Sequence, residues 1–250
     1  MKILKVAVVN SSKRANQVIA LSKYCKNLLK NNGISPSKIS VICNGVSRPT
    51  NFSNVNKNVL EKYGVNQEFI LYVSSFFRYK KFETVIHAFS QLPYDIKNKY
   101  QLVFIGTIQD GDYYNDLKDQ INTLGLQNRV IMIDTLSKDE LDQFYSNTAL
   151  FVFASLIENC PNILLEALSF SCPIISSSEE PMPEFGGDAI EYFDPDFPDE
   201  LAEKIINIIN SDQKLNYLSK MSGERSKIFS WDKFSNDVFR LVQKDYRRED

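Results

Sequence analysis

Residues 149 to 168 read A-L-F-V-F-A-S-L-I-E-N-C-P-N-I-L-L-E-A-L and contain an apolar run, an acidic loop and a helical pattern. The run at 149 to 154 is short and continuously apolar, which is typical of a buried strand. Pro161 has no N–H group and a fixed φ, so it fits the first position of a following helix. In an open parallel sheet, ligands bind where strands end and helices begin, because free backbone N–H groups point there. The stretch therefore predicts an α/β fold with a site for an anionic or polyhydroxylated ligand.

Length and composition describe an ordinary globular chain. At 250 residues, with 43% hydrophobic and 24% charged residues, it can bury a substantial core in one or two domains. The four cysteines have no C-x-x-C spacing and no nearby histidine, so we expect reduced thiols and no zinc site. No apolar run approaches the roughly 20 residues that a membrane helix needs, and the segment at 3 to 9 is too short and too charged for a signal peptide. We therefore expect a cytoplasmic protein.

Charge is distributed unevenly along the chain. Residues 1 to 50 contain nine Lys and Arg and no Asp or Glu, whereas the other 200 residues contain 20 basic and 31 acidic residues. Lys23, Lys26 and Lys30 fall on one face of a helix expected at 23 to 32. The segment either contacts an anionic surface, such as the inner face of a membrane, an acidic partner or nucleic acid, or is an ordinary solvated basic face.

Short apolar strands alternate with amphipathic helices over most of the chain. We expect strands at 69 to 75, 101 to 106, 129 to 133, 149 to 154, 173 to 176 and 189 to 193. We expect helices at 80 to 92, 112 to 125, 137 to 147, 161 to 171, 197 to 211, 213 to 228 and 231 to 247. This alternation predicts a Rossmann-like parallel sheet with helices on both faces.

A separate strand-helix-strand piece precedes this region, with strands at 16 to 21 and 38 to 43 around the helix at 23 to 32. The stretch at 47 to 58, rich in Ser and Asn, is interpreted as a linker. A piece of this size cannot bury its own apolar surface and must share a core with another structure. We therefore interpret it as the last unit of another domain.

A second candidate site follows the first strand of the regular region. Small residues end the strand, and a basic cluster with Arg78 and Lys80 opens the next helix, so N–H groups and cations can converge on a phosphate. Lysines at helix starts are also common on ordinary surfaces. Glu166 is surrounded by apolar neighbours, and a carboxylate in such a helix usually has a partner. Lys80 could bind a diphosphate, and the carboxylates of Glu158 and Glu166 could accept hydroxyl groups of a sugar or ribose. Together these groups describe a nucleotide-sugar site.

Three spaced motifs carry a family resemblance. Glu158 and Glu166 form E-x7-E, residues 44 to 46 read N-G-V, and residues 183 to 189 read P-E-F-G-G-D-A. In this order they resemble the motifs of the family 4 retaining glycosyltransferases, which have the GT-B fold. The match runs from about Asn16 to the end, so the chain resembles the C-terminal, donor-binding half with most of the N-terminal acceptor domain missing.

The resemblance implies a division of the chain. Residues 1 to 50 would be the remnant of the N-terminal GT-B domain with its junction, and residues 51 to 230 the Rossmann-like domain that binds the nucleotide sugar. Residues 231 to 250 would form a C-terminal helix that packs back towards the N-terminal piece. The acceptor domain would then belong to a separate polypeptide, or the chain would be a fragment.

The resemblance also implies roles for individual residues. Glu158 and Lys80 are the expected catalytic residues: Glu158 contacts the sugar hydroxyls, and Lys80 neutralises the phosphates as UDP or GDP leaves. Glu166 would accept the ribose hydroxyls. Negative charge develops on the departing diphosphate, so fixed donors there would contribute most to the rate. No metal or cofactor is expected.

The remaining donor-binding residues are expected around the two loops. Backbone N–H groups at the helix start would hold the diphosphate, namely those of Asn162, Ile163 and Leu164. Ser75 stands where the family usually has an arginine, and Arg78 would supply the guanidinium from a different angle. The backbone around Thr135 and Leu136 would frame the base. His87, the single histidine, matches no family site and is interpreted as structural or as a surface residue.

Two hypotheses remain at this point. The chain is the donor-binding half of a glycosyltransferase that transfers a hexose to a glycan or lipid-linked acceptor, or it is a nucleotide-sugar-binding module or inactive partner subunit without turnover. Glu158, Glu166 and Lys80 support donor binding in both. Nucleic-acid binding is not expected, because aromatic and basic residues do not interleave in an RNA-binding motif and the last 200 residues are acidic.

Overall fold

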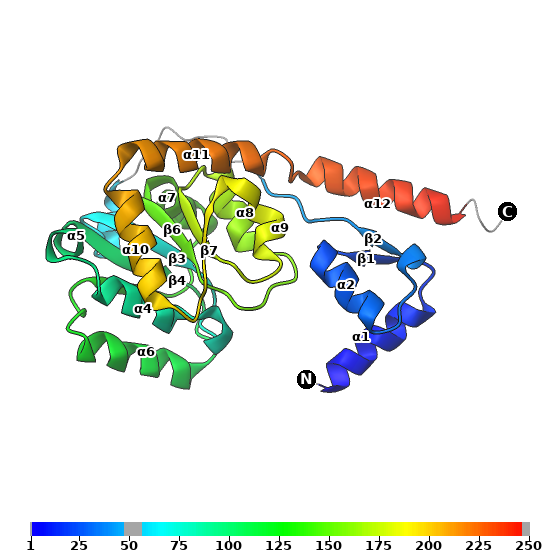
Figure 1. Ribbon diagram of the computed structural model, residues 1–250, viewed down its shortest axis with the longest axis horizontal. Helices are drawn as coiled ribbons and strands as arrows, with labels where there is room; N and C mark the ends of the chain where they lie inside the picture. The colour runs from blue at the N-terminus through cyan, green and yellow to red at the C-terminus, as the bar shows by residue number, and fades with distance from the viewer. Residues whose placement is uncertain (1, 48–56, 247–250) are drawn as a thin grey trace.

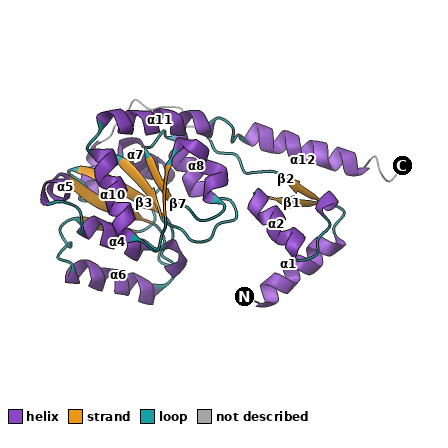
Figure 2. Ribbon diagram, viewed as in Figure 1, coloured by secondary structure: helices purple, strands orange, loops and turns teal. Residues whose placement is uncertain are grey.

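A six-stranded parallel sheet forms the larger part of the computed structural model, which describes residues 2–47 and 57–246. Its strand order is β5-β4-β3-β6-β7-β8, and every neighbouring pair is parallel. The strands are β3 (Glu68–Val73), β4 (Tyr100–Ile105), β5 (Val130–Ile133), β6 (Leu150–Phe153), β7 (Ile174–Ser177) and β8 (Glu191–Phe193). Figures 1 and 2 show helices on both faces of this sheet, so the predicted α/β fold is confirmed.

Helices precede β3, fill the crossovers between the strands of this sheet and follow β8. They are α3 (Lys57–Lys62), α4 (Phe82–Ser90), α5 (Tyr94–Lys99), α6 (Gly111–Thr123), α7 (Lys138–Asn147), α8 (Asn162–Ser169), α9 (Met182–Gly186), α10 (Pro198–Ile209), α11 (Asp212–Ser226) and α12 (Trp231–Tyr246). On one face α4 packs against α6 and α10, and on the other α8 packs against α11 and α3 against α7. The predicted linker at 47 to 58 lies largely outside the described residues, and its last two residues begin α3.

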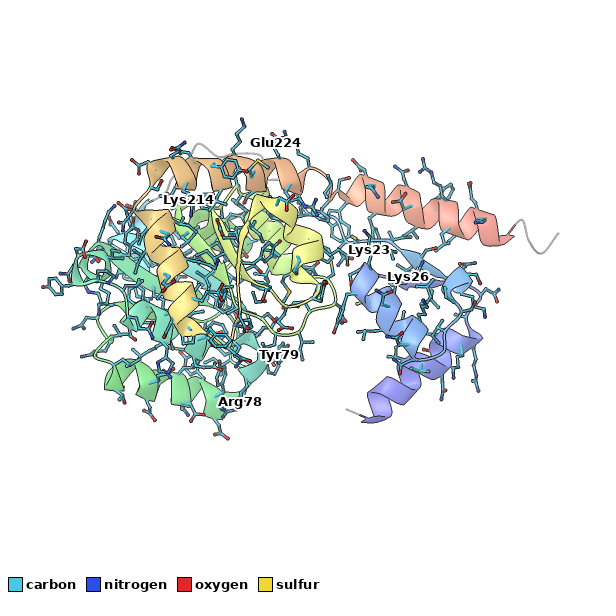
Figure 3. The ribbon with its side chains drawn as sticks, viewed as in Figure 1. Lys23, Lys26, Arg78, Tyr79, Lys214 and Glu224 are labelled. Atoms are coloured by element: carbon cyan, nitrogen blue, oxygen red, sulfur yellow. The ribbon has the colours of Figure 1, made fainter. Side chains whose placement is uncertain are left out.

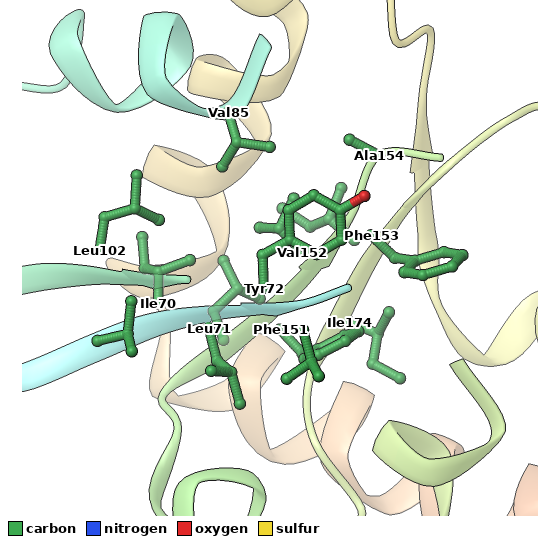
Figure 4. Close-up of a cluster of buried hydrophobic side chains, with 14 of the residues drawn as sticks. Ile70, Leu71, Tyr72, Val85, Leu102, Phe151, Val152, Phe153, Ala154 and Ile174 are labelled. Carbon is green, nitrogen blue, oxygen red and sulfur yellow. The ribbon is translucent and has the colours of Figure 1, made fainter. Parts of the chain in front are cut away.

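The core of the sheet extends up to the ends of the strands. Five of the six residues of β3 and all four of β6 are buried, as expected for parallel strands covered on both faces. Figure 4 shows Tyr72 among the buried side chains of this core. Its ring stacks on Phe82 with ring centroids 4.5 Å apart. Its hydroxyl donates to the carbonyl oxygen of Lys80 at 2.6 Å. A core residue therefore fixes the backbone of the loop that follows β3.

The N-terminal unit, residues 2–47, contains a second, two-stranded sheet. It comprises α1 (Lys2–Arg14), β1 (Val18–Ala20), α2 (Lys23–Asn31) and β2 (Ile39–Val41), and β1 pairs with β2 in parallel. The strand-helix-strand pattern was predicted, whereas α1 was not. Only a small buried cluster forms here, with Ala20, Ile34 and Ile39 at its centre. Apolar side chains remain exposed on three of its elements, at Val8, Ile19 and Leu28.

A carboxylate joins this unit to the larger sheet. The N–H groups of Lys23 and Tyr24, at the start of α2, donate to the Glu184 carboxylate at 2.8 and 3.3 Å. Arg225 on α11 holds the carbonyl oxygen of Glu184 at 2.7 Å. The first N–H groups of a helix have no partner within the helix, and a negative charge there also interacts well with the helix dipole. Glu184 on α9 therefore caps a helix from a distant part of the sequence.

Replacing Glu184 with alanine is expected to loosen the attachment of α2. Removal of a helix cap costs about 0.5–2 kcal/mol, so amide hydrogen exchange in α2 should become roughly two- to thirtyfold faster. Glu179→Ala is the matched control, because that exposed carboxylate has no hydrogen-bond or ion-pair partner among the described residues. Equal exchange rates in the two variants would contradict the capping role.

The N-G-V turn lies directly against the start of α12. A Cβ atom on Gly45 would come within 2.2 Å of the backbone nitrogen of Trp231, and Val46 donates its N–H to the carbonyl oxygen of Phe229 at 3.3 Å. Figure 1 shows α12 continuing from this crossing along the side of the N-terminal unit. The glycine of the motif is thus required by the close approach of two backbone segments.

Gly45→Ala is expected to lower the free energy of unfolding by about 1–3 kcal/mol, because the added methyl group forces two backbone segments apart. Denaturant unfolding of both variants would measure the effect. Gly111→Ala is the matched control, since a Cβ atom there meets nothing within 4 Å. A Gly45→Ala protein as stable as the Gly111→Ala protein would contradict the close packing.

Candidate functional site

Two loops meet at the carboxyl ends of β3 and β6. The chain builds β3, β4 and β5 outwards and then returns to place β6 on the other side of β3, where the two strands pair in parallel. Such a reversal of strand order leaves a crevice between the loops of the two central strands. The phosphate loop, residues 74–81, follows β3, and the acidic loop, residues 154–161, follows β6. Both predicted sites therefore lie at the same point of the sheet.

Lys80 and Glu158 connect the two loops. The Lys80 ammonium donates to the Glu158 carboxylate at 2.5 Å, and the two side chains are only 11% and 15% exposed. The N–H of Leu156 also donates to the carbonyl oxygen of Tyr79 at 2.9 Å. Lys81 follows with φ of 54°, a left-handed conformation that turns the chain sharply into α4. The structure thus brings together the two residues expected to be catalytic.

Free N–H groups lie at the start of α8. Among the described residues, no hydrogen-bond acceptor contacts the N–H groups of Ile163 and Leu164, whereas Leu165 makes the first helical bond, to Pro161. The N–H of Asn162 donates to the carbonyl oxygen of Cys160 at 2.8 Å, so the contact expected between this N–H and a diphosphate stays a prediction. Pro161 is also the N-cap rather than the first helical residue. Two of the three expected donors are therefore available to an anion.

The side chain of Asn162 has a different role. Its Oδ1 accepts a hydrogen bond from the side-chain amide of Asn44 at 3.0 Å. Asn44 belongs to the N-G-V turn, so this bond ties the turn to the start of α8. Sequence motifs identified both segments, but nothing in their spacing indicated that they touch.

Glu166 faces a cavity of about 200 Å³ on the next turn of α8. Gly45, Lys138 and Trp231 also line the cavity. Burial raises the pKa of Glu166, and a hydrogen bond from the Tyr145 hydroxyl at 3.1 Å opposes that shift. The predicted partner for this carboxylate is therefore Tyr145, a residue that the sequence did not single out.

Two residues of the phosphate loop make contacts other than those predicted. Arg78 donates to Asp116 at 2.8 Å, lies 3.7 Å from Asp110 and stacks its guanidinium over the ring of Tyr113. Without a ligand the Arg78 side chain pairs with acidic residues of α6 and its N-cap, so its expected role in place of the missing arginine stays a prediction. The Ser75 hydroxyl lies 3.0 Å from the hydroxyl of Thr107, in the loop after β4.

The loop after β5 makes its hydrogen bonds to residues close by in the sequence. The N–H of Thr135, expected to frame a base, donates to the neighbouring Asp134 carboxylate at 2.7 Å. Leu136 packs against the core, and neither residue lines the cavity beside Glu166. Ser137 caps α7 in a capping box with Glu140.

His87 and the cysteines take no part in this site. The His87 Nε2 lies 2.6 Å from the Gln120 side-chain amide, between α4 and α6, as a structural role predicts. All four cysteines are free thiols. Across residues 2–47 and 57–246, no group of three or more His, Cys, Asp or Glu side chains is arranged to hold a metal ion, and no helix is long and apolar enough to cross a membrane.

Comparison with known proteins covers most of the chain. The chain is 27% identical over 234 residues to an uncharacterized glycosyltransferase of Methanocaldococcus jannaschii, and the match covers 92% of this chain and 58% of the relative. It is 23% identical to N-acetylgalactosamine-N,N'-diacetylbacillosaminyl-diphospho-undecaprenol 4-alpha-N-acetylgalactosaminyltransferase of Campylobacter jejuni, covering 92% of this chain and 60% of the relative. The chain thus spans less than two thirds of the length of these relatives.

Solved structures have the same fold. Anabaena HepE in complex with UDP and glucose superimposes with a TM-score of 0.85 at 23% identity, covering 96% of this chain and 66% of HepE. The family model described as glycosyl transferases group 1 matches residues 56–225, which include both loops of the site. The chain therefore belongs to the group 1 glycosyltransferases.

Proposed function

We propose that the chain is the donor-binding half of a retaining, family 4 glycosyltransferase that transfers a hexose from a UDP- or GDP-linked donor to a glycan or lipid-linked acceptor. The observation that carries this proposal is the Lys80–Glu158 ion pair at the point where the strand order reverses. The acidic loop that holds Glu158 leads directly into α8, which carries the two free N–H groups and Glu166. A nucleotide sugar needs this combination, because it joins a diphosphate to two sets of hydroxyl groups.

The diphosphate would lie between Lys80 and the start of α8. The N–H groups of Ile163 and Leu164 and the positive end of the helix dipole favour an anion at this position. When the sugar–phosphate bond breaks, negative charge develops on the leaving diphosphate. Donors that are already fixed in place stabilise this charge without reorganisation. Lys80 and the two N–H groups would therefore act mainly on bond cleavage.

The two carboxylates would hold the two ends of the donor. Glu158, bound to Lys80, would accept hydroxyl groups of the transferred sugar next to the diphosphate. Glu166 lies on α8, eight residues after Glu158, and faces the cavity shared with the N-G-V turn, so it would accept the ribose hydroxyls. The complexes of HepE with UDP and with UDP-glucose, in a protein of the same fold, support a donor of this class.

The N-terminal unit would be one part of an acceptor-binding domain. An apolar cavity of about 630 Å³ lies between α1, β1 and α2 and extends to Asn159 of the acidic loop. Val8, Ile19 and Leu28 line it and remain exposed. We propose that an α/β acceptor domain covers this face, on the same or a separate polypeptide, since the relatives are longer than this chain. Residues 1–50 would then complete that domain, and α12 would pack against it.

A thermal-shift panel tests donor binding directly. UDP, GDP, ADP and their sugar conjugates would be added at about 100 times the dissociation constant, where a ligand stabilises the folded state by about 2.7 kcal/mol. At least one UDP or GDP compound should raise the melting temperature, and the shift should disappear in Glu166→Ala. A protein that no nucleotide stabilises would contradict the proposal.

We also propose that the basic face of α2 makes peripheral contact with anionic lipid at the inner face of the membrane. Lys23 and Lys26 are labelled on α2 in Figure 3, and Lys30 follows one turn later. Flotation with anionic and neutral vesicles would test this contact. Binding that requires anionic lipid and weakens with salt is expected, and equal recovery with both vesicles would contradict it.

A further inference from the structure

Two aromatic side chains project from the phosphate loop beside the ion pair. Phe77 and Tyr79 stack with ring centroids 5.3 Å apart and an interplanar angle of 20°. Tyr79 is 37% exposed although its neighbours Phe76 and Lys80 are buried. Among the described residues, its hydroxyl has no hydrogen-bond partner. Neither the fold nor the proposed roles of Lys80 and Glu158 account for an aromatic pair kept partly in solvent.

The backbone beneath this pair is fixed on both sides. The carbonyl oxygen of Tyr79 accepts the N–H of Leu156, and the next carbonyl oxygen, that of Lys80, accepts the Tyr72 hydroxyl. The loop is therefore anchored to the acidic loop and to the core. Figure 3 labels Arg78 and Tyr79 on this loop, and the Arg78 guanidinium donates to Asp116 at 2.8 Å. The backbone that carries the aromatic pair is thus anchored to both neighbouring segments.

Tyr79 lies next to the charged pair. The Lys80 ammonium is 5.1 Å from the centre of the Tyr79 ring, and the same ammonium contacts Glu158. Burial, and next the charge of Glu158, raise the pKa of Tyr79, so its hydroxyl stays neutral. Ile157 precedes Glu158 in the acidic loop, and its side chain is 64% exposed. Apolar and aromatic surface therefore flanks the carboxylate that is proposed to hold sugar hydroxyls.

We infer that Phe77 and Tyr79 form the apolar wall of the hexose subsite and contact the C–H face of the transferred sugar while Glu158 accepts its hydroxyls. A pyranose ring has a polar edge and an apolar face, and aromatic rings attract the weakly positive C–H groups of such a face. Binding sites for small molecules combine apolar walls with a few fixed polar groups in this way. The inference rests on the proposed function and adds residues that recognise the sugar rather than the nucleotide.

Paired titrations separate sugar recognition from nucleotide recognition. The dissociation constants of UDP and UDP-glucose, and of GDP and GDP-mannose, would be measured calorimetrically for the full chain and its variants. Tyr79→Ala should weaken the nucleotide sugar about fivefold and leave the parent diphosphate unchanged, because only the sugar loses its aromatic contact. Tyr79→Phe should bind like the unsubstituted chain, since the ring is retained. Tyr94→Ala, at a residue on α5 that is 79% exposed, is the matched control.

Three results would overturn the inference. Equal weakening of diphosphate and nucleotide sugar in Tyr79→Ala would show that Tyr79 acts through Lys80, and unchanged affinity for both would show that it contacts neither. Equal losses in Tyr79→Phe and Tyr79→Ala would assign the contact to the hydroxyl instead of the ring. If no nucleotide bound the unsubstituted chain, the proposed function itself would be contradicted. That result differs from the three above, in which the nucleotide binds and only the role of Tyr79 fails.

Discussion

Replacing Lys80 with alanine is expected to weaken nucleotide binding about ten- to a hundredfold. Lys80 supplies the ammonium group at the proposed diphosphate position, and hydrogen bonds between charged groups contribute about 1.5–3 kcal/mol each. The N–H groups of Ile163 and Leu164 remain in the variant, but a helix end contributes only about 0.3–2 kcal/mol. Calorimetric titration of the nucleotide that stabilises the unsubstituted chain most would measure the loss.

The same substitution should also destabilise the fold. Glu158 has a side chain that is only 15% exposed and loses its cation in the variant. Leaving one charge of a buried pair without its partner is costly, and we expect the free energy of unfolding to fall by about 2–4 kcal/mol because both side chains keep slight exposure to water.

A double variant separates these two effects. Lys80→Ala combined with Glu158→Gln removes the unpaired charge, so much of the lost stability should return while nucleotide binding stays weak. If the double variant regained both properties, Lys80 would be a structural residue only. Binding by the single variant with unchanged affinity would contradict the donor site itself.

Glu166→Gln is expected to weaken binding of the nucleoside diphosphate roughly thirtyfold, because an amide accepts ribose hydroxyls less strongly than a carboxylate. The stability of the fold should not fall. Burial already disfavours the charge at this position, and glutamine can still accept the hydrogen bond of Tyr145. Loss of binding with preserved unfolding energy would therefore identify a ligand contact. Loss of both together would indicate a structural residue.

The raised pKa of Glu166 also predicts a pH dependence. The ionised carboxylate is the form that accepts hydroxyl groups, and its fraction falls as pH drops through the raised pKa, so nucleotide affinity should weaken on acidification. Stability should change in the opposite sense. The folded state binds the proton more tightly than the unfolded state, so this group lowers stability as pH rises from the ordinary pKa to the raised one. Titrations at several pH values should show a slope that Glu166→Gln abolishes.

The strands were predictable because they are buried on both faces. Continuous apolar runs gave β3, β4 and β6 to within two residues, since a parallel strand covered by helices must be apolar throughout. The predicted start of the last strand at residue 189 is wrong, because residues 187 to 189 form a 3-10 turn and β8 begins at Glu191. The helices α5 and α9 were missed, since six and five residues are too few to show a helical period.

The candidate site was predictable where it depends on strand ends. Lys80 and Glu158 follow neighbouring strands, so parallel pairing alone brings their loops together. The direction in which the Arg78 side chain points was not predictable, because it depends on the 3-10 turn at Arg78–Lys80 and on the acidic residues at α6. The same holds for Tyr145, which reaches Glu166 only through the packing of α7 beside α8.

The most direct test of the central claim is a crystal structure of the chain with the UDP- or GDP-linked compound that stabilises it most. We expect a diphosphate within hydrogen-bond distance of the Lys80 ammonium and the N–H groups of Ile163 and Leu164. We also expect the ribose hydroxyls on Glu166 and the sugar beside Glu158 and Tyr79. A nucleotide bound elsewhere on the molecule, with the Lys80–Glu158 pair untouched, would contradict it.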